Sequence, residues 1–140
     1  MCNNDTESNT CQNCIADILK VILLLQDRAC GNDRCLQTCD RAFLGSGTTL
    51  VSNTRPIVLY TCGNVVPLEM PISRDPTVTD TSSVFRIEKL DGCCATCRVL
   101  APSEEGSTNP YTATNSFFTI DTNCVCILRC LDDTFVETAL

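Results

Sequence analysis

VFRIEKLDGCCATCRVLA, at residues 84–101, is the segment of this 140-residue chain that most directly indicates its fold. It consists of two runs rich in β-branched and aromatic residues, and such runs favour β-strands. Between the runs lies Asp91-Gly92, a dipeptide suited to a two-residue type I′ turn. The stretch therefore predicts an antiparallel β-hairpin.

The predicted turn also determines which residues of the two strands face each other. It places Lys89 opposite Cys94 and Arg86 opposite Cys97. A cation beside a thiol favours the thiolate, which is the form that attacks disulfides. Arg86 and Lys89 are therefore predicted to activate these two cysteines for cross-linking. Cys93 and Cys94 are adjacent on a strand, so we expect their side chains to leave opposite faces of the sheet and to have different partners.

Similar runs recur from residue 47 onward, separated by Pro, Gly, Asn and Asp, and the polar stretches 74–83 and 102–115 predict surface loops. The runs predict strands at 56–61, 65–70, 84–90, 93–101, 117–121 and 125–131. Pro67 restricts the second of these to a sheet edge or ends it early, because proline has no backbone N–H.

The N-terminal part of the chain has a different periodicity. Apolar residues at helical spacing predict an α-helix over 14–29, with Asn13 as its N-cap. We therefore expect a mainly β fold, an antiparallel β-sandwich or jelly-roll-like single domain with this N-terminal α-helix packed on or beside it.

The length of the chain suits one domain with short extensions at both ends. Residues 1–12 are polar and lack periodicity, which predicts a flexible cysteine-containing N-terminal arm. Residues 13–133 are predicted to form a single cysteine-rich domain, and residues 134–140 a C-terminal tail.

Composition argues against several classes of function. The net charge is −7 and the basic residues are scattered singly, so we expect no nucleic-acid partner. The longest apolar run, residues 21–25, is far shorter than the roughly 20 residues that cross a bilayer, so we expect no membrane insertion. The chain has no histidine, which excludes a Cys-His nucleophile within one chain. We expect no catalytic residues, no cofactor and no metal.

Cysteine is the dominant chemical feature of the chain. Thirteen cysteines is an odd number, so at least one thiol has no partner within its own chain and points to a neighbouring molecule. The cross-link candidates are Cys2, Cys11, Cys14, Cys30, Cys35, Cys39, Cys62, Cys93, Cys94, Cys97, Cys124, Cys126 and Cys130. The polar start of the chain shows no cleavable signal segment, so we expect synthesis in a reducing cytoplasm and cross-linking only when the compartment becomes oxidising.

The cysteines near the C-terminus share one parity. If their strand is unbroken, Cys124, Cys126 and Cys130 line one face and form a seam of thiols for cross-linking. The alternative is that these cysteines are buried as small hydrophobic residues.

Two other chemistries deserve comparison with cross-linking. Cys11-x-x-Cys14 and Cys94-x-x-Cys97 together have the ligand count of a four-cysteine zinc site, although residues three apart on a strand point to opposite faces. Cys11-x-x-Cys14 also lies at a predicted helix start, where a thiolate is stabilised, but no strand precedes it as in redox enzymes.

A set of short pieces resembles one protein family when taken in order over residues 11–133. The pieces are the spacing of Cys30, Cys35 and Cys39, then Phe43-Leu44-Gly45, Asn53-Thr54-Arg55-Pro56, Leu59-Tyr60-Thr61, Val84-Phe85-Arg86-Ile87-Glu88, Cys94-Ala95, Arg98-Val99-Leu100, Thr119-Ile120-Asp121 and Cys124-x-Cys126-x-x-x-Cys130-Leu131. The family is that of the Bacillus spore coat and exosporium proteins CotY, CotZ and ExsY. This chain lacks the histidine-rich N-terminal tract of its relatives and has additional cysteines at Cys93 and Cys97.

The resemblance implies a structural protein of the endospore surface, in the outer coat, crust or exosporium. It implies synthesis in the mother-cell cytoplasm and self-assembly into a two-dimensional hexagonal lattice locked by intermolecular disulfides. The expected partners are other copies of the chain and other coat or exosporium proteins. The alternative is a zinc-stabilised cysteine-rich adaptor that recruits other coat proteins.

Overall fold

A computed structural model describes residues 13–30 and 52–137 of the chain. Its elements are α1 (Cys14–Cys30), β1 (Ile57–Thr61), β2 (Met70–Pro71), β3 (Thr81–Ser82), β4 (Val84–Asp91), β5 (Cys94–Pro102), β6 (Tyr111–Asp121), the 3-10 turn η2 (Thr122–Cys124) and β7 (Val125–Cys130). The predicted N-terminal arm lies outside the described residues.

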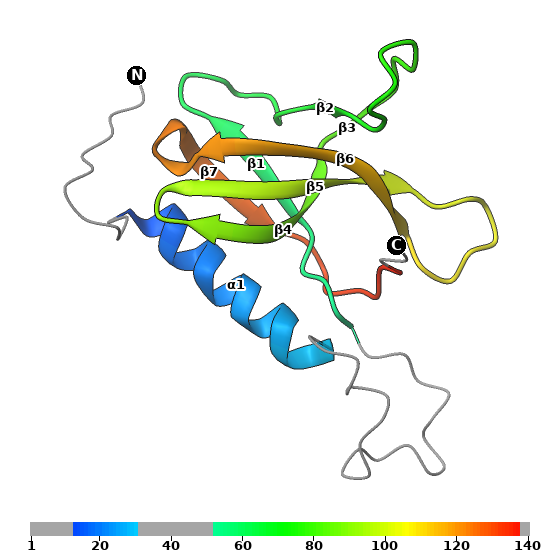
Figure 1. The fold of residues 1–140 in the computed structure, drawn as a ribbon, viewed down its shortest axis with the longest axis horizontal. Helices are drawn as coiled ribbons and strands as arrows, with labels where there is room; N and C mark the ends of the chain where they lie inside the picture. Colours follow the sequence, from blue (N-terminus) through cyan, green and yellow to red (C-terminus); the bar gives the residue numbers. More distant parts are fainter. Residues whose placement is uncertain (1–12, 31–51, 138–140) are drawn as a thin grey trace, which may run out of the picture.

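The strands form a five-stranded antiparallel sheet in the order β6-β5-β4-β1-β7, together with a small β2–β3 ribbon. β1 meets β4 at the single register pair Ile57 with Phe85. Beyond this junction β1 and β7 cross steeply behind β4, β5 and β6, so the sheet folds over into two layers (Figure 1). The predicted fold class, mainly β and antiparallel with an N-terminal helix, is confirmed.

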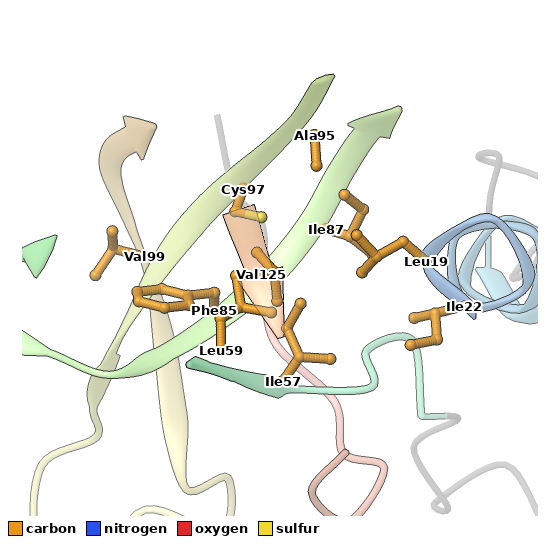
Figure 2. Close-up of a cluster of buried hydrophobic side chains, with 10 residues drawn as sticks. All are labelled: Leu19, Ile22, Ile57, Leu59, Phe85, Ile87, Ala95, Cys97, Val99 and Val125. Atoms are coloured by element: carbon orange, nitrogen blue, oxygen red, sulfur yellow. The ribbon is translucent and has the colours of Figure 1, made fainter. Parts of the chain in front are cut away.

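The hydrophobic core lies between the two parts of the folded sheet and the helix (Figure 2). Its buried members come from α1, β1, β4, β5 and β7, and they are Leu19, Ile22, Ile57, Leu59, Phe85, Ile87, Ala95, Cys97, Val99 and Val125. The ring of Phe85 also meets Phe118 of β6 edge to face, with 4.7 Å between the ring centroids. Every large strand of the sheet therefore contributes to one core.

Side chains near both ends of the helix attach it to the rest of the domain. At its start the Asn13 side chain accepts a hydrogen bond from the Ala16 N–H at 2.6 Å, which confirms Asn13 as the N-cap. Near its end the buried Gln26 donates to the Ile87 carbonyl at 3.0 Å and accepts from the Arg55 N–H at 3.1 Å. The helix is thereby attached to β4 and to the residues that lead into β1.

A β-bulge in β4 determines which residues enter the core. The β4–β5 register shifts between Ile87 and Lys89, so Glu88 has no direct partner. In an unbroken strand Lys89 would follow Ile87 into the core. The bulge instead turns Lys89 to solvent and lets Leu90 pack against the core beside the buried Ala95.

Two predicted boundaries differ from the structure. The strand predicted at 65–70 shrinks to β2, because Pro67 cannot donate a ladder hydrogen bond and Val65 is 92% exposed. β6 begins at Tyr111, inside the loop predicted at 102–115, since an edge strand tolerates the polar threonines of this segment on its open face.

The segment after β7 is attached to the domain. Thr134 forms a bridge with Thr54, and Val136 is fully buried. The Asn53 side chain donates to the Val136 carbonyl and accepts from its N–H, both at 2.9 Å. Residues 134–136, predicted to begin a C-terminal tail, therefore pack on the domain.

Candidate cross-linking site

Within the part of the chain that the structure describes, most cysteine-bearing segments lie at one end of the domain, which we call the cysteine pole. It consists of the start of α1, the end of β1, the β4–β5 turn, η2 and the start of β7, and it carries Cys14, Cys62, Cys93, Cys94, Cys124 and Cys126. These segments lie together at the end of Figure 1 where the blue start of α1 is found.

Hydrogen bonds to the turn η2 hold the cysteine pole together. The Asn13 side chain donates to the Thr122 hydroxyl at 3.1 Å and to the Asn123 side-chain oxygen at 3.0 Å. The Thr122 N–H donates to the Cys93 carbonyl at 2.8 Å, and the Cys62 N–H donates to the Cys124 carbonyl at 3.1 Å. The turn η2 therefore links the helix, the hairpin turn and the end of β1.

The cysteines of the pole are in two chemical states. Cys62 and Cys126 form a disulfide within the chain, with their Cα atoms 4.9 Å apart and a sequence separation of 64 residues. Cys93 and Cys124 are also disulfide-bonded. Cys14 and Cys94 are free thiols and are exposed. The pole thus combines in-chain disulfides with two thiols that can react with another molecule.

The structure corrects the predicted register of the hairpin. The two turn residues are Gly92 and Cys93, flanked by the pair Asp91 and Cys94. Gly92 has φ of 60°, and no other residue than glycine in the described part of the chain has a positive φ. A type I′ turn over Asp91-Gly92 would need positive φ at both residues, whereas a II′ turn needs it only at its first, which is Gly92. The turn therefore lies one residue later than predicted.

As a consequence, the prediction that cations face the hairpin thiols is wrong. Lys89 pairs with Thr96, and Cys94 pairs with Asp91 on one side and Asp121 on the other. The strand pairing therefore gives no basis for activation of Cys94 by Lys89.

Arg86 also lies away from its predicted position opposite Cys97, and its side chain binds Glu88 and Thr54. It pairs with Arg98 in the register, and Glu88 lies between the two guanidinium groups, with contacts of 2.8 Å to Arg86 and 3.0 Å to Arg98. Arg86 also donates to the Thr54 hydroxyl at 2.8 Å. The Arg98 guanidinium stacks 4.3 Å from the centre of the Phe117 ring. This network connects the bulge in β4 to the edge strand β6.

Cys97 belongs to the core. Its side chain is fully buried, and burial together with the charge of Glu88 raises the pKa of the thiol to about 12. Cys94 is exposed while Cys97 points inward, so these two residues do not form one half of a zinc site. Among the residues that the structure describes, no three potential metal ligands gather.

The predicted seam of three C-terminal thiols is also corrected. Cys124 lies in η2 rather than on the strand, and Cys126 is at a bulge in β7 and is bonded to Cys62. Of the three, Cys130 alone is a free and exposed thiol. It pairs with Ile57 at the end of β7 away from the cysteine pole.

The remaining cross-link candidates have no described side chain. Cys2, Cys11, Cys35 and Cys39 lie outside the described residues, and Cys30 is the last residue of α1. The Cys11-x-x-Cys14 pair therefore stays a prediction. Within the described residues, no helix has both the length and the hydropathy to span a bilayer.

A small mainly β domain with in-chain disulfides at one end and free thiols on its surface has the features of a cysteine-rich structural protein. The family model of spore coat protein Z matches residues 1–111, and the chain belongs to this family. It is therefore a structural protein of the spore coat, located at the spore surface and associated with coat components. Comparisons with curated proteins and with solved structures find no match.

Proposed function

We propose that this protein tiles the outer layer of the spore as a two-dimensional hexagonal lattice, in which disulfides join neighbouring copies. Synthesis in the mother-cell cytoplasm precedes deposition on the spore as part of the outer coat, crust or exosporium. Other coat proteins attach to the same layer. The observation that carries the proposal is the placement of three free, exposed thiols, Cys14, Cys94 and Cys130, at separate points of the surface.

The spacing of these thiols favours a network of many cross-linked copies over a disulfide-bonded dimer. Cys14 and Cys94 lie at the cysteine pole, whereas Cys130 lies at the other end of the six-residue strand β7. At about 3.3 Å per residue, β7 separates Cys130 from the pole by roughly 16 Å. A chain with reactive thiols at two separated places bonds more than one neighbour, and several bonds per chain add avidity to each contact.

Electron microscopy of the purified, oxidised protein after heating in detergent tests the proposal. We expect wild-type sheets to survive without reductant and to dissolve with it, whereas the Cys14→Ala, Cys94→Ala, Cys130→Ala triple variant gives no resistant sheets. Cys97→Ala is the matched control, because it removes a free thiol that is buried. Resistant sheets from the triple variant would rule out these thiols as the links. Monodisperse wild-type particles in both conditions would rule out the lattice.

A further inference from the structure

The outer face of α1 carries an apolar stripe that the domain does not use. Ile18, Val21, Leu24 and Leu25 are 44–52% exposed, although all four are large and apolar. Ile18, Val21 and Leu25 follow each other at spacings of three and four residues, so they lie on one line along the helix. This is the spacing of the contact positions in a pair of helices that pack along their length.

The domain packs against a different side of α1. Leu19, Ile22 and Gln26 point into the protein and are buried, as Figure 2 shows for the two apolar residues. The described elements that pack against this inner side are β4, β7 and η2. In Figure 1, α1 lies along the outside of the sheet. The inner contact is enough to bury one apolar stripe of a helix. The second, exposed stripe of α1 therefore indicates that a second partner binds there.

The charges beside the stripe identify the partner. Asp17 lies in the first turn of α1 and Arg28 in the last, and between them Lys20 precedes Asp27. When two copies of α1 lie antiparallel, Asp17 of one comes beside Arg28 of the other, and Lys20 comes within reach of Asp27. A parallel arrangement would bring like charges together. The helix is therefore complementary to itself across a two-fold axis.

We propose that α1 pairs antiparallel with α1 of a second copy, with Val21 of each helix against Leu24 of the other near the axis. This inference rests on the proposed function, because it supplies a reversible contact of the assembly that disulfides later lock. Each Cys14 lies about 8 residues from the axis, so the two Cys14 residues are roughly 25 Å apart. That separation is far beyond disulfide reach, which leaves both thiols for further neighbours.

The test measures self-association of the full chain by sedimentation velocity, with exposed thiols alkylated by iodoacetamide and the in-chain disulfides intact. We expect a concentration-dependent dimer whose dissociation constant rises roughly 30-fold or more in Val21→Asp, since a charge would enter the centre of the interface. Val65→Asp is the matched control, because Val65 is an even more exposed valine away from α1. Circular dichroism and thermal unfolding show that each variant keeps its fold.

A charge exchange tests the antiparallel orientation. Asp17→Arg and Arg28→Asp should each weaken the dimer, and the double variant should restore it. Failure of the double variant to recover would overturn the antiparallel pairing. So would a Cys14–Cys14 disulfide that forms when the unalkylated wild type is oxidised but not when Val21→Asp is. A wild-type chain that stays monomeric while Val21→Asp lowers its thermal stability would show that a segment of the same chain covers the stripe, and this also overturns the proposal.

The outcomes separate this inference from the proposed lattice. Resistant sheets that form equally well from wild type and Val21→Asp would refute the helix pairing and leave the lattice standing. Dimers that depend on Val21, in a protein that never forms sheets, would support the pairing and refute the lattice.

Discussion

Removal of the Cys62–Cys126 disulfide by the paired change Cys62→Ala, Cys126→Ala is expected to destabilise the domain strongly. The bond closes a loop of 64 residues that starts after β1 and returns in β7. In the loop-closure model, loss of a cross-link of this span lowers the free energy of unfolding by about 4 kcal/mol. Cys93 and Cys124 are also disulfide-bonded, and their cross-links remain in this variant. We therefore expect a loss of roughly 2–4 kcal/mol.

Urea unfolding of the oxidised, monomeric protein measures this loss, with exposed thiols alkylated so that no cross-links form between chains. The matched control is Cys14→Ala, Cys94→Ala, which also removes two cysteines of the pole but breaks no bond in the chain. Because both control sites are exposed, we expect a change within about 0.5 kcal/mol.

Two results would contradict a stabilising in-chain disulfide. A loss below about 1 kcal/mol for the Cys62→Ala, Cys126→Ala variant would mean that the bond does not constrain the unfolded chain as the loop length requires. Peptide mapping that finds Cys62 joined to Cys126 of another copy would show that the bond belongs to the assembly rather than to the fold.

Four further predictions concern the core and the hairpin. Burial raises the pKa of the Cys97 thiol to about 12, so the unfolded chain loses this proton at lower pH than the folded chain. The free energy of unfolding of the wild type, relative to that of Cys97→Ala, should therefore fall between about pH 9 and 12. In urea titrations the fall should be at most about 1.4 kcal/mol per pH unit. In the native protein at pH 8, iodoacetamide should label Cys94 but not Cys97, and labelling of both at equal rates would contradict the burial of Cys97. Phe85→Ala should cost roughly 3–5 kcal/mol in urea unfolding, because the ring is fully buried, whereas the same change at the half-exposed Phe117 should cost clearly less. Gly92→Ala should cost about 1–2 kcal/mol in thermal unfolding, since Gly92 has φ of 60°, and an unchanged stability would exclude the II′ turn.

The sequence predicted the elements better than it predicted how they pair. The periodicity of apolar residues is local information, and it correctly indicated α1, its N-cap Asn13 and most of the strands. The hairpin at 84–101 was also correct as an element. The predicted pairing of its two strands was wrong, because two features that the alternation of apolar and polar residues does not reveal determine the register. One is the turn that begins at Gly92, and the other is the bulge at Glu88 that allows Leu90 to pack inward.

The cysteine pole was not predicted, because no local pattern connects its members. Cys62 and Cys126 are 64 residues apart and meet only because β1 and β7 are neighbours in the sheet. The parity argument for a C-terminal seam failed since it assumed an unbroken strand, whereas η2 and the bulge at Cys126 interrupt it. One part of the pole could have been inferred from Asn13. The N-cap uses only the side-chain oxygen of an asparagine, so its NH2 group can donate to a second segment, which here is η2.

The positions of the cysteines separate folding from cross-linking in a way that suits a protein assembled before it is oxidised. Cys97 lies in the core, where burial and the raised pKa protect it from exchange once the chain has folded. The disulfide of Cys62 and Cys126 lies at the surface, outside the buried cluster, so the core can form without it. Cys14 and Cys130 are exposed, and they lie at the ends of α1 and β7 rather than in the middle of a packing face. On the proposed function, apolar contacts therefore set the geometry of the layer while they are still reversible, and oxidation of the peripheral thiols then makes that geometry permanent.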